Sequence, residues 1–460
     1  MAGAASGPRL VVAGTHSGVG KTTVATGLLA ALRAAGHRPA PAKVGPDFID
    51  PGYHALAAGR PGRNLDAWIC GADAIVPLAA RAASGGDVLV IEGVMGLFDG
   101  AVDGSASSTA DVARLLDAPV VLVVDASALS GSVAALVSGY ARFDERVRVG
   151  GVILNRVGSD GHEVLLREAL TPLGIPVLGA LRRDDALVWR DRHLGLVPVV
   201  ENPAAIDRSL GRLAALIAAS CDLDALMALA RSAAPLDAPA AEPGPAAAAR
   251  RVRVAIAGGA AFSFTYQDNL EALEGAGAEL VAFDPRADDL PDGVHGLVAG
   301  GGFPEVFAAE LGANDRLAAT LRRRIAAADL AVWAECGGLL WLARSLDGRD
   351  LVGAVDAAGT MTGRLTLGYR EADVLVDNPV AAAGATLRGH EFHYSTLDPP
   401  GAALRLRSRF GIRLEGHAAP DLLATYLHLH LGADDGPARR FVAACARLAA
   451  VPAPAPTVGS

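Results

Sequence analysis

Two short segments of this chain hold residues whose types and spacing suit catalysis. The first, GTHSGVGKTT at 14–23, follows an apolar run at 10–13 and precedes a helical pattern at 24–35. A strand, a glycine-rich turn, Gly-Lys-Thr and a helix are typical of a phosphate-binding loop. In such a loop, backbone N–H groups and a helix N-terminus converge on phosphate oxygens. The segment therefore predicts a nucleotide-binding site.

Within this loop, we expect Lys21 to reach the β- and γ-phosphate oxygens and Thr22 to place its hydroxyl on Mg²⁺. The spacing departs from the usual pattern, because Thr15 stands at the first glycine position and Gly14 lies one residue earlier. A glycine-rich turn that binds nothing is the alternative, which the combination of strand, lysine, hydroxyl and helix disfavours. The other ATP-binding residues expected in the loop are Gly18, Gly20 and Thr23.

An acidic residue follows the apolar run at 88–91. Glu92 is therefore expected at the end of a buried strand, where it is placed to hold Mg²⁺ or a water bound to it. Capping the next helix is the alternative role for such a residue. The presence of Lys21 and Thr22 favours the metal role.

The segment KVGPDFIDPGYH at 43–54 has the Pro and Gly of a loop but also one lysine, two aspartates and one histidine. Two aspartates beside a triphosphate need Mg²⁺ to offset their charge. Asp47 and Asp50 are therefore candidates for holding the metal or positioning a carboxylate; of the two, we assign Asp47 to the metal and Asp50 to positioning of the substrate or nucleotide. A plain turn role is the alternative for both. Lys43 is expected to contact phosphate or an anionic substrate.

Two further polar residues are expected at the same site. Asp99, in GLFDG at 96–100, follows the strand that ends at Glu92, although Asp-Gly is also an ordinary turn pair. Asn155 follows an apolar run at 151–154 and suits an amide that reads the base of a nucleotide. A turn role is the alternative for Asn155.

The second catalytic segment centres on a cysteine. An apolar strand at 331–334 runs into Glu335-Cys336-Gly337-Gly338, and a helix follows from Leu339. This arrangement resembles a nucleophile elbow, in which the helix N-terminus lowers the pKa of the thiol. The N–H of Gly337 is expected to stabilise an oxyanion. The backbone of GGGFPE at 300–305 is expected to supply the second donor, with Gly301 as the candidate.

A nucleophilic thiol needs a base, and TYLHLH at 425–430 supplies two histidines. On a strand, His428 and His430 would share one face. Either His428 or His430 could act as the base; two purely structural histidines are the alternative. The segment GHEFHY at 389–394 has histidines three apart, which disfavours the helical zinc motif, so we interpret it as substrate-side or structural.

Elements that alternate along the first half must position these residues. Apolar runs at 10–13, 88–92, 119–125, 150–154 and 196–199 alternate with helical patterns. This pattern predicts an α/β fold with a doubly wound, mainly parallel sheet, which binds ligands at the carboxyl ends of its strands. We assign residues 1–230 to this ATP-binding domain, 231–250 to a Pro/Ala-rich linker, 251–450 to a second α/β domain and 451–460 to a disordered tail.

Composition limits the function classes. Of the 460 residues, 51% are hydrophobic and 20% are charged, as in globular proteins. The net charge of −9 gives no support for nucleic-acid binding. No apolar run reaches the ~18 residues of a membrane span, and the N-terminus lacks a signal-peptide pattern. We therefore expect a cytoplasmic protein that binds neither nucleic acid nor membrane.

Eight segments together resemble the cobyrinic (or hydrogenobyrinic) acid a,c-diamide synthase family of cobalamin biosynthesis. One segment alone would be weak evidence, but eight in order over nearly the whole chain are specific. They are GTHSGVGKTT at 14–23, KVGPDFIDPGYH at 43–54, EGVMGLFDG at 92–100, AFSFTYQDNLE at 261–271, GGGFPE at 300–305, ECGGL at 335–339, GHEFHYS at 389–395 and TYLHLH at 425–430.

The resemblance implies a dethiobiotin-synthetase-like ATPase domain fused to a class I glutamine amidotransferase domain. Such an enzyme uses ATP and glutamine to amidate two acetate side chains of a corrinoid. By resemblance, Lys21 and Thr22 fall on the phosphate loop, and Cys336 falls on the thioester-forming nucleophile. The acidic residues Asp47, Asp50 and Glu92 fall on the ATP and Mg²⁺ set, and Asp99 falls near the activated carboxylate.

The chain departs from related families at two positions. His16 stands where switch ATPases carry an extra lysine, which argues against a dimerising partition ATPase. In His428-Leu429-His430, a histidine stands where the wider amidotransferase class has a glutamate. This difference predicts a Cys–His dyad with His428 as the base and His430 as the alternative.

The expected reaction transfers the γ-phosphoryl group of ATP to a carboxylate, and ammonia released from glutamine by Cys336 then attacks the acyl phosphate. We expect this ammonia to travel through a protected channel. Alternatives are amidation of another tetrapyrrole, such as a nickel sirohydrochlorin, and a non-catalytic ATP switch, which Cys336 disfavours. The sequence leaves open whether the corrin holds cobalt, the order of the amidations and the oligomeric state, for which a homodimer is one candidate.

Overall fold

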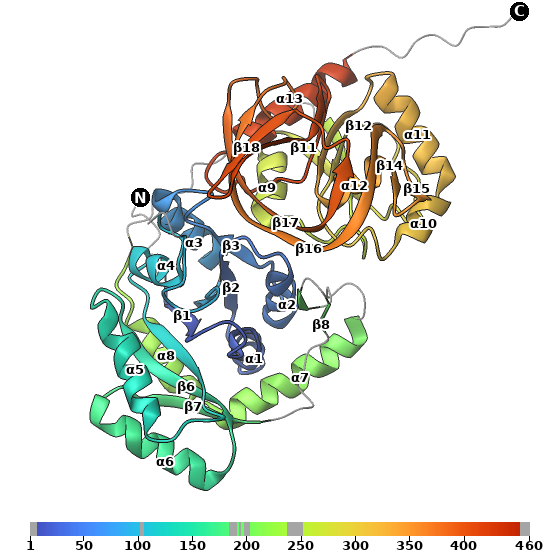
Figure 1. The fold of residues 1–460 in the computed structure, drawn as a ribbon. Helices are drawn as coiled ribbons and strands as arrows, with labels where there is room; N and C mark the ends of the chain where they lie inside the picture. The colour runs from blue at the N-terminus through green and yellow to red at the C-terminus, as the bar shows by residue number, and fades with distance from the viewer. Residues whose placement is uncertain are drawn as a thin grey trace, which may run out of the picture. The chain divides into compact units, whose positions relative to one another are not determined.

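A computed structural model of the chain describes residues 7–101, 105–183, 191–192, 195–196, 203–236 and 252–450. The chain forms two units, residues 1–242 and 243–460 (Figure 1). The division falls inside the segment 231–250 assigned above to a linker, of which residue 231 still belongs to a helix and 237–250 lie outside the described residues. The tail expected at 451–460 also lies outside them.

A seven-stranded parallel sheet forms the centre of the first unit, in the order β3-β2-β4-β1-β5-β6-β7. Its strands are β1 (Arg9–Gly14), β2 (Pro39–Val44), β3 (Arg63–Leu65), β4 (Val88–Glu92), β5 (Val120–Asp125), β6 (Val149–Val157) and β7 (Val177–Arg182). The helices are α1 (Lys21–Ala34), α2 (Ile49–Ala58), α3 (Ile75–Ala83), α4 (Thr109–Leu115), α5 (Ser132–Phe143), α6 (Asp160–Leu170), α7 (Pro203–Ser220) and α8 (Leu223–Arg231), with short 3-10 turns at Ala72–Ala74 and Thr171–Leu173.

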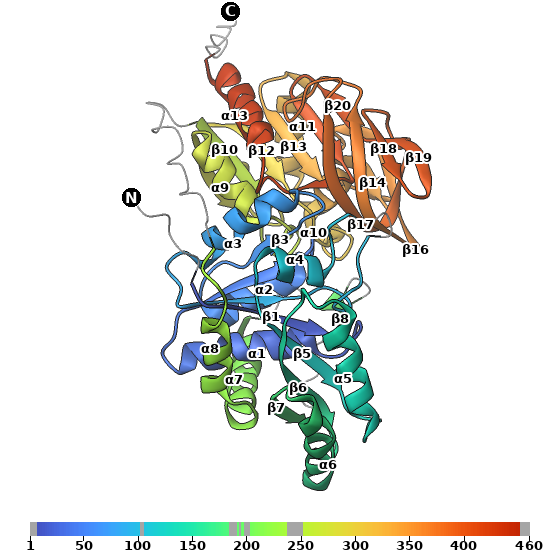
Figure 2. The same ribbon diagram turned by 90° about the vertical axis from the view of Figure 1, so that its left-hand side faces the viewer.

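Helices cover both faces of this sheet, as Figure 2 shows. Side chains of α3, α4, α5 and α6 form one core with alternate residues of the strands, such as Val11 and Ala13 of β1. Helix α1 packs against α7. Because both faces of the sheet are buried, its central strands are continuous apolar runs, and such runs can be recognised in the sequence.

The structure confirms the predicted strands at 10–13, 88–92, 119–125 and 150–154. Three strands of the sheet were not predicted. Of these, β2 reads PAPAKV and lacks an apolar run, and β3 has only three residues. The prediction that 196–199 form a strand of this sheet was wrong, because β9 (Gly195–Leu196) pairs with β8 (Asp191–Arg192) in a separate antiparallel pair. Residues 197–199 lie outside the described residues.

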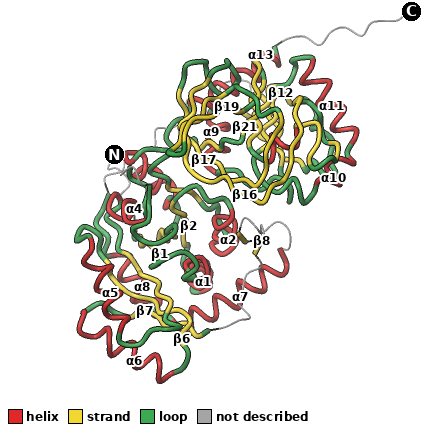
Figure 3. The backbone as a smooth tube through the Cα atoms, in the orientation of Figure 1, coloured by secondary structure: helices red, strands yellow, loops and turns green. Residues whose placement is uncertain are grey.

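The second unit contains two sheets (Figure 3). The first has the order β11-β10-β12-β13-β21-β20 and is parallel except at β20. Its strands are β10 (Val252–Ala257), β11 (Ala278–Phe283), β12 (Val294–Ala299), β13 (Ala331–Glu335), β20 (His417–Ala419) and β21 (Leu422–Thr425). The helices of the unit are α9 (Gln267–Gly275), α10 (Ala308–Ala313), α11 (Asp315–Ala326), α12 (Gly337–Leu342) and α13 (Gly436–Ala449).

The other sheet is mainly antiparallel and was not predicted. Its long central pair joins β16 (Val355–Val374) to β17 (Thr386–Asp398), and β17 also pairs with β22 (His428–Leu429). The remaining strands are β14 (Ala343–Leu346), β15 (Arg349–Asp350), β18 (Leu404–Ser408) and β19 (Gly411–Glu415). Within the described ranges, no helix combines the length and apolar character needed to cross a bilayer.

Candidate active sites

The phosphate-binding loop lies between the end of β1 and the start of α1, as predicted. Gly18 and Gly20 have φ angles of 80° and 99°, which side chains rarely adopt. A Cβ on Gly20 would also lie 2.3 Å from Nδ2 of Asn155. The buried Lys21 side chain donates from Nζ to the carbonyl oxygen of His16 at 3.1 Å. Glycine is therefore required here, and the lysine folds back over the loop.

Two consecutive residues of β6 brace this loop. Asn155 Nδ2 donates to the carbonyl of Val19 at 2.9 Å, and Arg156 donates to the carbonyl of Gly18 at 2.9 Å while pairing with Asp125. The predicted role of Asn155 as a base-reading amide stays a prediction, since the structure shows a contact with the loop instead. Arg156 was not predicted; its only signal was a charge directly after Asn155.

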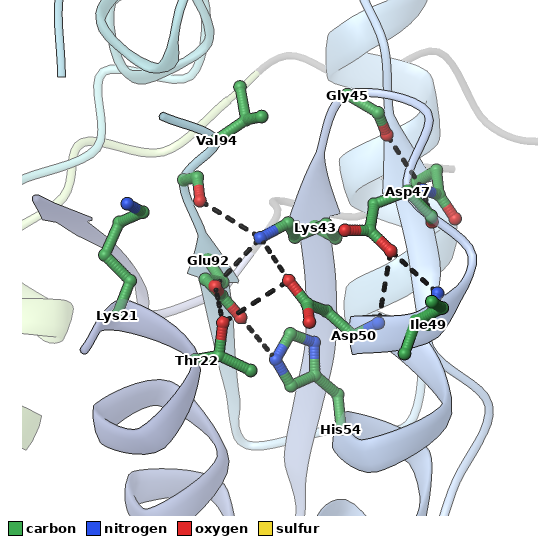
Figure 4. Close-up of polar contacts among 12 residues, drawn as sticks. Lys21, Thr22, Lys43, Gly45, Asp47, Ile49, Asp50, His54, Glu92 and Val94 are labelled. Atoms are coloured by element: carbon green, nitrogen blue, oxygen red, sulfur yellow. Dashed lines mark hydrogen bonds and ion pairs between the residues drawn. The ribbon is translucent and has the colours of Figure 1, made fainter. Parts of the chain in front are cut away.

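A buried lysine joins the acidic residues of the site (Figure 4). Lys43 Nζ lies 2.7 Å from Oδ2 of Asp50 and 2.8 Å from Oε1 of Glu92. Thr22 Oγ1 donates to the same Glu92 oxygen at 2.7 Å and lies 3.4 Å from Asp50 Oδ2. The end of β2, the end of β4 and the starts of α1 and α2 therefore bring four predicted site residues together.

Burial and charge act in opposite directions on this cluster. Burial lowers the pKa of Lys43, but Asp50 and Glu92 outweigh it and raise that pKa above its ordinary value. Burial alone would raise the pKa of Glu92, but Lys43 and His54 lower it below the ordinary value. Burial and Asp47 raise the pKa of Asp50. Glu92 and Lys43 are therefore both charged at neutral pH.

The oxygen donors of this cluster fit Mg²⁺. Carboxylate and hydroxyl oxygens are its preferred protein ligands, and the ammonium of Lys43 shows that Glu92 and Asp50 accept a cation between them. In the part of the chain that the structure describes, no three His, Cys, Asp or Glu side chains are arranged to hold a metal by themselves.

Asp47 and Asp99 make local contacts beside this cluster. Asp47 Oδ1 accepts from the N–H groups of Ile49 at 2.7 Å and Asp50 at 3.2 Å, so this oxygen has the turn role left open above. Its role as a metal ligand stays a prediction. Asp99 Oδ2 accepts from the Gly96 N–H at 2.8 Å. Burial and the charge of Lys43 lower the pKa of Lys21 below its ordinary value, and the smaller opposing effects of Glu92, Asp50 and Asp99 do not offset them.

His54 belongs to this site but was given no role from the sequence. Its Nε2 lies 2.6 Å from Oε2 of Glu92, and the two side chains are 1% and 0% exposed. His54 stands four residues after Asp50 on α2, so both face the same side of the helix. That spacing was the signal available in the sequence.

The cysteine lies on the predicted elbow, between β13 and α12. Cys336 has φ 48° and ψ −98°, a strained conformation for a residue with a side chain. Its N–H donates to the carbonyl of Thr425 at 2.7 Å, which ties the turn to the end of β21. A Cβ on Gly338 would lie 2.2 Å from the carbonyl oxygen of Ala299, so the close approach needs glycine.

Of the two candidate bases, His428 is the partner of Cys336. Burial lowers the pKa of His428, but the Cys336 thiolate, a hydrogen bond with it and Glu335 raise that pKa to about 10. His430 contacts other groups: its Nε2 lies 3.8 Å from Oδ2 of Asp268, and its ring centroid lies 4.4 Å from that of Tyr266. Only His428 lies in a strand, since β22 ends at Leu429.

A carboxylate also faces this histidine. Nδ1 of His428 lies 3.4 Å from Oε2 of Glu335. The sequence predicted a Cys–His dyad in which no carboxylate contacts the base, because His430 stands where related amidotransferases have a glutamate. The structure places a different acidic residue there, one that directly precedes the nucleophile in the chain.

The predicted oxyanion donors need one correction. The N–H of Gly301 donates to the carbonyl of Phe264 at 3.2 Å, in an isolated bridge between these residues, so it is not directed at a substrate. The next amide lies closer to the elbow, because a Cβ on Gly337 would be 3.0 Å from the nitrogen of Gly302. Gly337 keeps its predicted position directly after Cys336.

The segment GHEFHY lies on β17, as its strand pattern predicted. Glu391 is fully buried and pairs with Arg370 at 2.6 Å and with Arg413. These ion pairs support the structural interpretation of the segment. The ring of His390 stacks on that of His428 with centroids 5.0 Å apart. Burial, together with His428, lowers the pKa of His390 well below its ordinary value, so this ring is neutral.

Comparison with known proteins agrees with these two sites. Residues 10–196 match the model of the CobQ/CobB/MinD/ParA nucleotide binding domain, and residues 253–436 match that of the CobB/CobQ-like glutamine amidotransferase domain. The phosphate loop lies in the first match and Cys336 in the second.

Similar proteins extend over nearly the whole chain. The hydrogenobyrinate a,c-diamide synthase of Streptomyces coelicolor is 50% identical, covering 95% of this chain and 97% of its own. That of Thermobifida fusca is 49% identical, with 95% and 96% covered. The cobyrinate a,c-diamide synthase of Syntrophotalea carbinolica is 43% identical, with 95% and 98% covered. The chain therefore belongs to the family of the hydrogenobyrinate and cobyrinate a,c-diamide synthases.

Proposed function

We propose that this chain amidates the a and c acetate carboxylates of hydrogenobyrinate, with ATP and glutamine as co-substrates. The observation that supports the proposal is the presence in one chain of a phosphate-binding loop at Lys21 and a cysteine on a strand-to-helix turn at Cys336. The relatives at 49–50% identity are named for hydrogenobyrinate and the one at 43% for cobyrinate, which favours the metal-free corrinoid. We assign the reaction to the cytoplasm, where ATP and glutamine are both available.

The first step activates a carboxylate, because an oxide is too poor a leaving group for direct amidation. A substrate carboxylate oxygen attacks the γ-phosphorus of ATP, and ADP leaves. Lys21 neutralises charge on the transferred group. Thr22, Asp47 and Glu92 are the residues that would hold Mg²⁺, whose charge would stabilise the phosphoryl oxygens. Ammonia then attacks the carbonyl carbon of the acyl phosphate, and inorganic phosphate leaves.

The second site supplies the ammonia. The Cys336 thiolate attacks the side-chain carbonyl carbon of glutamine, and the resulting oxyanion faces the N–H groups of Gly337 and, in our proposal, Gly302. Protonated His428 donates its proton to the leaving nitrogen, so ammonia departs and a thioester remains. Water hydrolyses the thioester to glutamate and restores the thiolate. Asp99 and Lys43 are proposed to contact the carboxylate or phosphate at the first site.

Mass spectrometry tests the proposal directly. The protein is incubated with ATP, Mg²⁺, glutamine and either hydrogenobyrinate or cobyrinate, and each amidation replaces OH by NH₂. We expect two such mass changes on hydrogenobyrinate. Conversion of cobyrinate alone would overturn the assignment to the metal-free ring, and ATP hydrolysis without a mass change on either compound would point to another tetrapyrrole.

A further inference from the structure

We propose that Glu335, the residue directly before the nucleophile, orients and charges His428, so that Cys336, His428 and Glu335 act as a triad in glutamine hydrolysis. The inference rests on the amidotransferase activity proposed above and assigns a positioning residue to it. Glu335 acts through the imidazole rather than on the substrate.

The strained turn at Cys336 explains how two consecutive residues, Glu335 and Cys336, can both interact with His428. Strand β13 ends at Glu335, and the positive φ of 48° at Cys336 turns the chain into α12. Glu335 Oε2 faces Nδ1 of His428 at 3.4 Å. Since Nδ1 is directed at the carboxylate, Nε2 is the ring nitrogen left to exchange a proton with the thiol. Glu335 would thus fix both the tautomer and the direction of the ring.

Two hydrogen bonds hold the carboxylate in this position. Trp333 Nε1 donates to Oε1 of Glu335 at 3.0 Å, and the N–H of Leu429 donates to the same oxygen at 3.2 Å. Trp333 and Glu335 lie two apart on β13 and therefore face the same side. With Oε1 bound twice, Oε2 remains directed at His428. Glu335 thus contacts both the imidazole and the backbone of β22.

The charge of Glu335 also matters, because His428 is buried. Burial disfavours imidazolium and lowers the pKa of His428, whereas the thiolate and Glu335 raise it to about 10. A further titratable group at this ring is His390, which stacks on it from β17 and on which the charge of His430 also acts. His390 is neutral, so the Glu335 carboxylate stabilises the thiolate–imidazolium pair.

The test uses Glu335→Gln, which keeps the shape and removes the charge. An amide NH₂ beside Nδ1–H would also favour the wrong tautomer. Replacing the orienting carboxylate of a catalytic triad by an amide can lower kcat by about 10⁴-fold; we expect glutamate release here to fall by at least about 10²-fold. Amidation with high ammonium should be unchanged. We also expect the pH range over which iodoacetamide rapidly alkylates Cys336 to narrow, and Glu335→Asp to restore part of that range.

Other outcomes would overturn the proposal. A wild-type alkylation profile for Glu335→Gln would show that the residue is only structural, even if turnover falls. The same would follow if Asp268→Asn, beside His430, reproduced the effects and Glu335→Gln did not. If Glu335→Gln fails to fold, Trp333→Phe keeps the carboxylate, removes one of its donors, and should shift the profile less in the same direction. Retained glutamate release by Cys336→Ser would instead refute the proposed amidotransferase site itself.

Discussion

Nε2 of His54 lies 2.6 Å from Oε2 of Glu92, and both side chains are buried. The other oxygen of Glu92 accepts from Thr22 and Lys43, so each carboxylate oxygen has its own partners. His54 therefore fixes the plane of the carboxylate that we expect to hold Mg²⁺, although it touches neither substrate in our proposal.

Replacing His54 should weaken the use of Mg²⁺ and ATP. Loss of a side chain that orients a metal ligand typically costs about 10- to 100-fold in metal affinity or activity. For His54→Asn, we expect the Mg²⁺ concentration for half-maximal ammonium-dependent amidation to rise by about tenfold. Glutamate release should be unaffected. His37→Asn, at a half-buried histidine after α1, is the matched control. An unchanged Mg²⁺ dependence would contradict the positioning role.

Cys336→Ser separates the two chemical steps. A serine hydroxyl at this position is far less acidic than a thiol, so the attack on glutamine should stop. We expect glutamine-dependent amidation to be lost while amidation with high ammonium continues. Cys70→Ser, at a half-buried cysteine of the first unit, is the control and should retain both activities. Loss of both activities in Cys336→Ser alone would argue against two separable sites.

Gly301 has a steric role even though its N–H is used by Phe264. A Cβ at this position would lie 2.6 Å from Cε1 of His428. Gly301→Ala should therefore displace the imidazole and lower glutamate release by at least about tenfold, because small misplacements of catalytic groups are costly. Gly275→Ala adds its methyl group to open space and is the control. Normal glutaminase kinetics for Gly301→Ala would show that the ring can shift without loss.

The buried carboxyl of Glu415 should make stability depend on pH. Burial raises its pKa from an ordinary 4.5 to about 7, although hydrogen bonds from Thr425 and the Tyr426 N–H oppose the shift. Because the folded chain holds this proton more tightly, the contribution to stability is full below about 4.5 and is lost as the pH rises through about 7. The loss is at most about 3 kcal/mol.

Urea unfolding of wild type and Glu415→Gln at about pH 5 and about pH 8 measures this effect. The free energy of unfolding of the variant, relative to wild type, should increase between the two pH values. Ammonium-dependent amidation serves as a check that the first unit is intact in both proteins. Parallel pH dependences would show that Glu415 titrates normally.

The phosphate loop and the elbow were predictable because each is a local sequence pattern. Lys21, Thr22 and Cys336 lie at strand-to-helix turns whose glycines are visible in the sequence. Glu92 was predictable for a related reason, since it ends an apolar strand. Contacts between segments that lie far apart in the sequence could not be predicted, because no local pattern specifies them. The hydrogen bond from the Gly301 N–H to the carbonyl of Phe264 occupies the oxyanion donor expected from the sequence, and the contact of Glu335 with His428 depends on how β22 lies beside β13.

Lys43 has a consequence for how the ATP site forms. Asp50 and Glu92 are two carboxylates removed from water, and unneutralised they would repel each other and oppose folding. The ammonium between them acts as a counter-ion supplied by the chain itself. The fold itself therefore preorganises the two carboxylates, because Lys43 neutralises their charge in the folded chain.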